Sequence, residues 1–233
     1  MGKTTSISWT KSTLNTAYGC TKVTIECDNC YIWKNLPIYG YDPSKIVILP
    51  SALTKEKLRK RIMNLQDLVF VNNYSDTYHY QIPDYMRCLW FDVFREFPNK
   101  IFQILTKRPG LALLFHRNYP LPENCWFGVS CGIKQAKHRL DIARKVSSKI
   151  RFVSVEPLLE DLGGLNLEGI HWVIIGGESG RNPRPMKKEW VDSIIKQCRE
   201  QGARVFFKQW GGIGGDGSGG CLYEGKTIKE FPN

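Results

Sequence analysis

Three cysteines near the N-terminus lie at a spacing that suits metal binding. Cys20, Cys27 and Cys30 form a C-x6-C-x2-C triplet, and Tyr31 follows directly. A structural zinc site is normally closed by four protein ligands, so three thiolates leave one coordination position open. An open position is useful for chemistry because a substrate or cosubstrate can occupy it. The triplet therefore predicts a metal site with one exchangeable ligand.

The other five cysteines are scattered and read as small core residues. No charged-then-apolar signal segment opens the chain, so eight cysteines argue against a disulfide framework and predict a reducing, cytoplasmic compartment. No apolar run approaches the length needed to cross a bilayer, and we expect no membrane association. The five scattered cysteines are Cys88, Cys125, Cys131, Cys198 and Cys221.

The net charge of +11 and the pI near 9.3 indicate a polyanionic partner, most simply nucleic acid. Basic residues gather at 55–61, 134–151 and 181–188. Each stretch alone is typical of a solvated helix face. Together with the overall excess of positive charge, they favour contact with a nucleic acid or a nucleotide.

Short apolar runs alternate with helical patterns after the cysteines, which indicates a parallel sheet covered on both faces. We expect an α/β fold, a partial (β/α)6-type barrel of parallel strands, with an open doubly wound sheet as the alternative. Strands are expected at 68–72, 100–106, 125–130, 151–156, 172–176 and 204–207, with a further candidate first strand at 46–49. Residues 1–233 are expected to form one domain, with a metal-binding loop at 18–32 and a glycine-rich tail at 211–233.

Polar residues follow each expected strand, and the carboxyl ends of parallel strands build the ligand site in such folds. Glu156 and Glu178 come directly after apolar strands, where a free carboxylate would be costly. Lys107 and Lys208 are placed to pair with these carboxylates, either as a salt-bridge network or as part of a site for a polar ligand.

Blocks along nearly the whole chain resemble a known family. They include Gly-Cys at 19–20, Cys-Asp-Asn-Cys-Tyr at 27–31, Thr-Lys-Arg-Pro at 106–109 and Gly-Gly-Glu-Ser-Gly at 176–180. In these blocks the chain resembles the phage and bacterial three-cysteine-motif family. That family is in turn similar to divergent radical S-adenosylmethionine enzymes near the spore photoproduct lyase group.

The resemblance implies a [4Fe-4S] cluster on Cys20, Cys27 and Cys30, with S-adenosylmethionine on the fourth iron. It also implies a 5'-deoxyadenosyl radical that takes hydrogen from a substrate, and a low-potential electron donor as partner. A nucleic acid or nucleotide is the expected substrate. Hypermodification or rearrangement of a thymine substituent is the specific expectation, in the host cytoplasm if a phage encodes the chain. The subclass (isomerase, lyase or transferase) stays open.

The same resemblance assigns roles to residues at the strand ends. Tyr31 is expected to pack against the cluster or the adenine. Lys107, Glu178 and Lys208 are the candidate catalytic residues. The residues expected to hold S-adenosylmethionine or substrate are Asn72, Ser75, Asp76, Ser130, Glu156, Gly176 and Gly177.

The six-residue gap between the first two cysteines departs from the usual C-x3-C-x2-C spacing of radical enzymes and keeps zinc or a purely structural cluster open. Two functions other than that of a radical enzyme are the alternatives. One is a non-enzymatic nucleic-acid-binding protein with a structural zinc or iron-sulfur site, which predicts a fourth protein ligand and salt-dependent binding. The other is a nuclease or base-excision factor that uses Asp76, Glu156 and Glu178 on a divalent metal.

Overall fold

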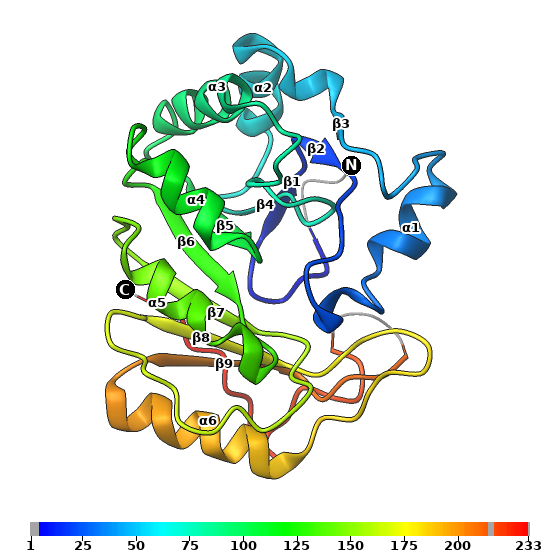
Figure 1. The fold of residues 1–233 in the computed structure, drawn as a ribbon, viewed down its shortest axis with the longest axis vertical. Helices are drawn as coiled ribbons and strands as arrows, with labels where there is room; N and C mark the ends of the chain where they lie inside the picture. The colour runs from blue at the N-terminus through cyan, green and yellow to red at the C-terminus, as the bar shows by residue number, and fades with distance from the viewer. Residues whose placement is uncertain (1–4, 214–216, 233) are drawn as a thin grey trace.

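Seven parallel strands form one curled sheet, a half-barrel, in the computed structural model, which describes residues 5–213 and 217–232 (Figure 1). Their order is β1-β4-β5-β6-β7-β8-β9. The predicted partial barrel of parallel strands is therefore confirmed. The strands are β1 (Ser12–Leu14), β4 (Leu68–Val71), β5 (Ile101–Thr106), β6 (Cys125–Ser130), β7 (Arg151–Val155), β8 (Trp172–Gly176) and β9 (Arg204–Gln209).

Five helices pack on the outer, convex face of the sheet, whereas α1 (Ile32–Ile38) lies apart from them beside the inner face (Figure 1). Pro109 begins α4 because its missing N–H is not needed in the first helical turn. Gly202, with φ 76°, ends α6 in the left-handed conformation that glycine adopts without strain. The outer helices are α2 (Lys55–Met63), α3 (Asp84–Arg95), α4 (Pro109–His116), α5 (His138–Arg144) and α6 (Lys188–Gln201).

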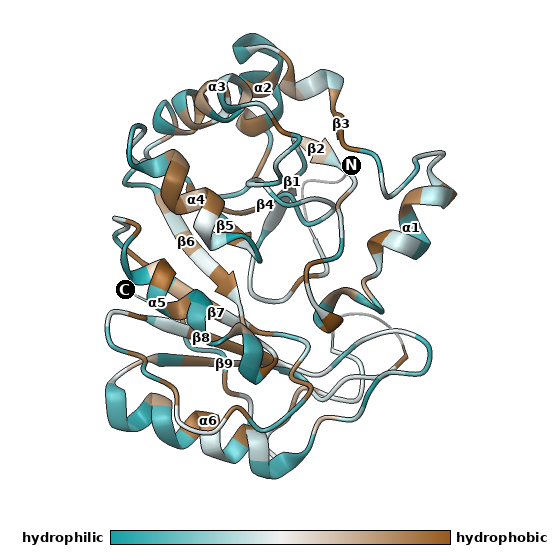
Figure 2. Ribbon diagram, viewed as in Figure 1, coloured by the Kyte–Doolittle hydropathy of each residue, from teal (hydrophilic) through white to brown (hydrophobic). Residues whose placement is uncertain are grey.

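The strands are apolar along their length because each one contributes to two cores. Successive side chains point to opposite faces, so Phe127 and Val129 of β6 pack under the helices while Trp126 faces the interior of the half-barrel. Figure 2 shows the hydrophobic strands beneath helices whose outer turns are hydrophilic. The buried residues of the inner core are Trp9, Leu68, Phe70, Trp126, Ile150, Phe152, Trp172, Ile174 and Phe206.

Aromatic rings fill the interior of the half-barrel. The Trp9 ring lies 4.5 Å from Phe70 and 6.2 Å from Trp172, measured between ring centroids. From the other end of the chain, Phe231 approaches Trp172 to 5.2 Å. The segments before β1 and after β9 therefore both pack against the inner core of the half-barrel.

The expected strand at 46–49 is wrong as a member of this sheet. Its residues form β3 (Val47–Ile48), which pairs antiparallel with β2 (Ala17–Tyr18) in a separate two-stranded sheet. The seventh parallel strand is β1, whose three residues pair with β4 at the edge of the half-barrel. A strand this short and this polar carries no apolar run by which sequence could reveal it.

The predicted glycine-rich tail folds back onto β8 and β9, although its residues 214–216 and 233 lie outside the described residues. Gly211 N–H donates to Ser218 O at 2.9 Å, and Gly212 N–H donates to Glu178 O at 2.9 Å. Lys229 then pairs with Phe206 along the free edge of β9. Within 5–213 and 217–232, no helix is long and apolar enough to cross a membrane.

A glycine in β6 allows the inner core to close, and its replacement gives a test. A Cβ at position 128 would lie 2.3 Å from the Phe152 ring, so we expect Gly128→Ala to lower the free energy of unfolding by about 1–3 kcal/mol. Gly110→Ala in α4, where a Cβ meets nothing within 4 Å, is the control and should be neutral or stabilising by up to about 1 kcal/mol. Urea unfolding measures both, and equal losses in the two variants would contradict the packing described.

Candidate metal centre and cofactor pocket

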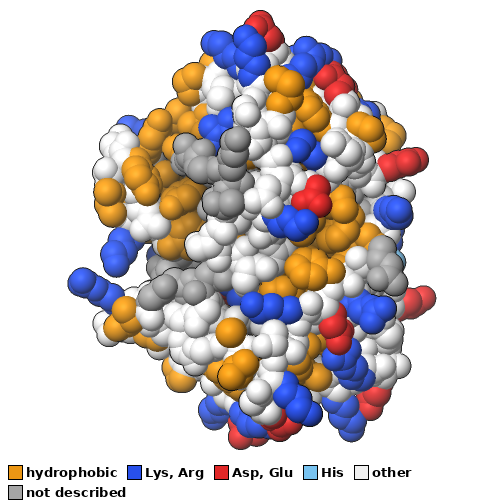
Figure 3. Space-filling view, turned by 180° about the vertical axis from the view of Figure 1, so that it is seen from behind, with side chains coloured by type: hydrophobic (Ala, Val, Ile, Leu, Met, Phe, Trp, Pro, Cys, Tyr) orange, Lys and Arg blue, Asp and Glu red, His pale blue; other side chains and the backbone are white. Residues whose placement is uncertain are grey.

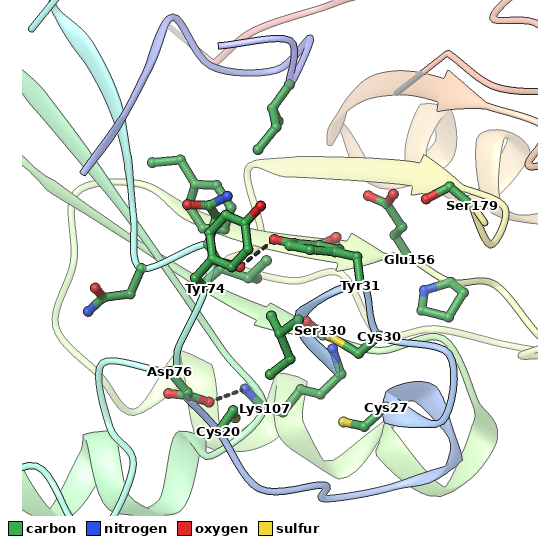
Figure 4. Close-up of a pocket in the computed structure, with 18 of the residues that line it drawn as sticks. Cys20, Cys27, Cys30, Tyr31, Tyr74, Asp76, Lys107, Ser130, Glu156 and Ser179 are labelled. Carbon is green, nitrogen blue, oxygen red and sulfur yellow. Dashed lines mark hydrogen bonds between the residues drawn. The ribbon is translucent and has the colours of Figure 1, made fainter. Parts of the chain in front are cut away.

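A pocket of about 600 Å³ lies at the carboxyl ends of the parallel strands (Figure 4). All three cysteines of the triplet line it, and of the other predicted site residues only Gly176 does not. The structure therefore brings the predicted residues together, while their roles stay predictions. The other predicted residues that line the pocket are Tyr31, Asn72, Ser75, Asp76, Lys107, Ser130, Glu156, Gly177, Glu178 and Lys208.

The cysteine loop (residues 18–32) runs from β2 to α1 and carries the three thiols. Cys27 ends a short 3-10 helix, Cys30 precedes α1, and the Tyr31 hydroxyl donates to the carbonyl of Asn73. Burial raises the pKa of Cys20 to about 11 and also raises the pKa of Cys30. Both thiols are therefore protonated at neutral pH unless a bound cation stabilises the thiolates, so metal binding here would release protons.

A buried ion pair fixes the start of the cysteine loop. Arg108 Nη1 lies 3.0 Å from Asp76 Oδ2, and both side chains are more than nine-tenths buried. The Asp76 carboxylate also accepts from Thr106 Oγ1 at 2.8 Å. Arg108 then donates to the carbonyl of Thr21 at 2.7 Å and to Cys20 Sγ at 3.6 Å. Asp76 thus acts on the first cysteine through Arg108.

A second, fully buried ion pair fixes the middle of the loop. Arg139 of α5 donates to Glu26 Oε2 at 2.7 Å and to the carbonyl of Ser130 at 2.8 Å. Glu26 also accepts from Gly132 N–H at 2.7 Å and from Thr24 Oγ1 at 2.6 Å. Burial alone would raise the pKa of Glu26, but neighbouring Lys and Arg charges and these hydrogen bonds lower it below its ordinary value. Glu26 is therefore a buried, charged anchor next to Cys27.

A third ion pair fixes the end of the loop. Arg184 N and Nε both donate to Glu178 Oε2 at 3.0 Å, and Asn29 Nδ2 donates to the same oxygen at 2.7 Å. Arg184 Nη1 reaches the carbonyl of Ile25 at 2.9 Å. The expectation that a lysine pairs with Glu178 is wrong, because Arg184 folds back from six residues along the chain and occupies its carboxylate.

The two lysines of the pocket differ in their surroundings. Lys208 Nζ pairs with Glu156 Oε1, as predicted. Lys107 extends into the pocket beside the cysteines (Figure 4), and within the described ranges no hydrogen bond or ion pair holds its Nζ. Lys107 is therefore available to bind an anionic group of a ligand.

Two polar residues after β4 hold the entry of the cysteine loop. Asn72, which adopts φ 60°, accepts from Thr16 N–H at 2.8 Å and donates to Thr77 Oγ1 at 3.0 Å. Ser75 Oγ donates to the carbonyl of Gly19 at 2.7 Å. Both side chains therefore position the chain that leads to Cys20.

Gly176, the last residue of β8, and Gly177, which follows it, leave room for neighbouring parts of the protein. A Cβ at position 177 would lie 1.9 Å from the Trp210 carbonyl oxygen, and one at position 176 would lie 3.3 Å from Cδ of Glu156. Ser130, buried at the end of β6, lines the pocket nearby. At both glycines, the space that a side chain would need is therefore already occupied by other atoms of the protein.

A single metal ion and a [4Fe-4S] cluster need differently arranged protein ligands. In the part of the chain that the structure describes, no group of three or more His, Cys, Asp or Glu side chains could hold one metal ion. A [4Fe-4S] cluster makes a different demand, because each thiolate binds its own iron. Cys20 and Cys30 each interact electrostatically with Cys27, and all three face one pocket. Three cysteine thiols on one pocket are the donor type and number that a [4Fe-4S] cluster with one open iron would need.

Four residues that position the cysteine loop were not identified from the sequence. Arg108 and Arg184 had a signal, because they lie next to the Thr-Lys and Gly-Gly-Glu blocks. Glu26 lies inside the triplet but carries no pattern of its own. Arg139 looks like one more cation of a basic helix face, and only the fold shows that it is buried.

These features define an α/β half-barrel protein with a three-cysteine loop over a pocket at its strand ends. The chain belongs to the family described as "Protein of unknown function (DUF5131)", whose model matches residues 4–232. No curated protein matches the chain.

Two similar solved structures are spore photoproduct lyases, both at 16% sequence identity. A mutant of that lyase with a cysteine replaced by serine gives a TM-score of 0.46, with 84% of this chain and 63% of that chain covered. The lyase complexed with dinucleoside spore photoproduct gives a TM-score of 0.44, with 79% of this chain and 60% of that chain covered. The chain thus spans about three fifths of the length of these structures.

The third ion pair predicts a pH-dependent stability. Burial raises the pKa of Glu178, but hydrogen bonds from Arg184 and Asn29 outweigh it and lower this pKa below the ordinary 4.5. The stabilisation is therefore present above pH 4.5 and is lost as the pH falls through the lower, folded-state value. We expect Glu178→Gln to lower the free energy of unfolding at pH 7 by about 1–3 kcal/mol, and the deficit to shrink in acid.

Thermal unfolding of wild type and variant between pH 3 and pH 7 measures this difference, with the exposed Glu123→Gln as control. A difference in stability between wild type and Glu178→Gln that stays constant across this range would contradict a charged Glu178 in the third ion pair.

Proposed function

We propose that this protein is a radical S-adenosylmethionine enzyme. The observation that carries the proposal is the presentation of three thiols, on one clamped loop, into a single pocket of about 600 Å³ at the carboxyl ends of parallel strands. That volume lies within the range of small-molecule and cofactor sites. Three protein ligands leave one iron of a [4Fe-4S] cluster open for the amino and carboxylate groups of S-adenosylmethionine.

The proposed roles follow from what each side chain is free to do. Cys20, Cys27 and Cys30 would hold the cluster. Lys107, whose Nζ makes no hydrogen bond within the described residues, would bind the carboxylate of S-adenosylmethionine. Tyr31 would pack against the cofactor. Asn72, Ser75, Asp76 and Glu178 would act indirectly, because their polar groups are bound to the protein and hold the loop.

Part of the pocket lining is apolar. Trp9 and Phe70 of the inner core and Leu105 line its inner part. The Lys208–Glu156 pair lies at its polar rim, where one of the two could hold or move a proton. When bound, the cluster and S-adenosylmethionine supply one electron and a sulfonium, whose cleavage gives methionine and a 5'-deoxyadenosyl radical that takes hydrogen from substrate.

A nucleic acid base or nucleotide is the proposed substrate class. The net charge of +11 favours a polyanionic partner, and a modified or rearranged thymine is the specific prediction from the sequence resemblance. A low-potential electron donor would be the second partner, in the cytoplasm. Membership of the three-cysteine-motif proteins of phages and bacteria, and a single domain over residues 1–233, stay predictions of the same kind.

The alternative functions have weaker support. A structural zinc site needs four converging ligands, and the described residues contain no such group. A nuclease site on Asp76, Glu156 and Glu178 needs carboxylates that are free to bind a divalent metal. Each of these three carboxylates is instead ion-paired with an arginine or a lysine.

Anaerobic reconstitution with iron and sulfide tests the proposed function. After reduction with S-adenosylmethionine, the wild type should form 5'-deoxyadenosine, measured by chromatography. We expect Cys20→Ala, Cys27→Ala and Cys30→Ala each to reduce both bound iron and this product to background, because each removes a cluster ligand. Cys88→Ala and Cys221→Ala, which lie outside the pocket, serve as controls. Iron uptake without 5'-deoxyadenosine in the wild type would reject the radical mechanism.

A further inference from the structure

Five tyrosines form one continuous cluster along the α1 side of the pocket. Tyr74 is its centre, with the Tyr31 ring at 5.4 Å, Tyr18 at 5.7 Å and Tyr39 at 6.5 Å between centroids. Tyr41 joins through Tyr18 at 4.9 Å. Every contact is edge-to-face, with interplanar angles between 63° and 85°. We call Tyr31, Tyr39 and Tyr74, which line the pocket, the tyrosine wall.

Hydrogen bonds fix two rings of the tyrosine wall, and Tyr39 packs against one of them. The Tyr31 hydroxyl donates to the carbonyl of Asn73, and Asn35 Nδ2 donates to the Tyr74 hydroxyl at 3.3 Å. Tyr31 is nevertheless 41% exposed and Tyr39 61% exposed. Rigid aromatic rings that stay exposed at a concave site are typical of binding surfaces, because little conformational entropy is lost when a ligand covers them.

Hydrophobic side chains gather over α1 in Figure 3, where this helix lies on the left. Lys and Arg side chains are spread over the same face of the molecule and outnumber Asp and Glu there. This face of the molecule therefore combines hydrophobic side chains over α1 with an excess of positive charge.

The charged side chains that line the pocket form ion pairs, with the exception of Lys107 among the described residues. Each of the four carboxylates that line the pocket has an ion-pair partner. Lys107, which has none within the described ranges, is the residue assigned above to the carboxylate of S-adenosylmethionine, so the positive charge for a further anionic ligand lies outside the pocket, where Lys34 of α1 is exposed. An anionic ligand with a planar apolar group matches this combination better than an acidic peptide does, because a peptide would leave the exposed tyrosine faces uncovered.

We infer that the tyrosine wall stacks an unpaired base of a nucleic acid strand, with the rest of the strand held by the basic surface outside the pocket. This inference rests on the proposed function and deepens it by naming the form of the substrate. A base in a duplex already has neighbours on both faces, so it must leave the helix before it can stack on Tyr39 or Tyr74. Stacking on aromatic rings beside a basic surface is the usual way in which proteins bind single strands.

Fluorescence anisotropy with a labelled single-stranded DNA 12-mer, and with the same sequence as a duplex, tests the inference. Single-stranded DNA should bind more tightly than the duplex. Tyr39→Ala should weaken single-strand binding by about 5- to 150-fold, the range expected for loss of one stacked base. Tyr39→Phe keeps the ring and should bind as the wild type does. Tyr85→Ala, which removes a tyrosine that is 70% exposed on α3 outside the pocket, should also have no effect.

The outcomes separate this inference from the proposed function, because anisotropy requires neither the cluster nor turnover. Preference for the duplex, or equal affinities of wild type and Tyr39→Ala for single-stranded DNA, would contradict base stacking on the tyrosine wall, even if 5'-deoxyadenosine forms. Tight single-strand binding that depends on the Tyr39 ring would support base stacking on the tyrosine wall even if no 5'-deoxyadenosine forms. In that case only the proposed radical mechanism would be contradicted.

Discussion

Three ion pairs between carboxylates and arginines, two of them buried and the third partly exposed at Arg184, hold the cysteine loop against the carboxyl ends of the strands. Asp76–Arg108, Glu26–Arg139 and Glu178–Arg184 act at its start, middle and end. Removing one partner of a buried pair typically costs about 3–5 kcal/mol, because the other charge is left without compensation. Moving the loop away from the strands would separate Glu26 from Arg139 and would break the hydrogen bonds from Arg108 to the Thr21 carbonyl and from Arg184 to the Ile25 carbonyl. Arg108 follows β5, Arg139 belongs to α5 and Arg184 follows β8, so parts of the fold that are distant in sequence hold the loop together.

The interior of the half-barrel has an aromatic core and, at the carboxyl ends of the strands, a polar pocket. Aromatic residues such as Trp9, Phe152 and Trp172 fill the lower part and keep it dry. Apart from Gln103 in the middle of β5, the polar and charged residues of the site lie where the strands end, so the ion pairs and Lys107 lie beside an apolar core. Electrostatic interactions are stronger in such surroundings than in water. The chain therefore needs few residues to orient a charged ligand, and most of its polar pocket side chains hold the loop.

Much of the fold could be predicted from sequence because buried parallel strands are apolar on both faces, as in the run that becomes β8. The meeting of polar clusters at one pocket followed from the parallel topology alone. The strand β1 could not be predicted, since its three residues are ordered by pairing with β4 rather than by their own propensity. Arg139 could not be assigned either. Its partner Glu26 lies 113 residues away, and only tertiary packing turns an apparent surface cation into a buried one.

The central claim is that three thiols of one clamped loop hold a four-iron cluster with one open iron. Electron paramagnetic resonance of the reduced, reconstituted protein, recorded with and without S-adenosylmethionine, tests it most directly. The account predicts a [4Fe-4S] signal whose g-values change when S-adenosylmethionine is added, because new nitrogen and oxygen ligands then bind the open iron. A cluster signal that S-adenosylmethionine leaves unchanged, or a protein that takes up zinc and no cluster, would contradict the account.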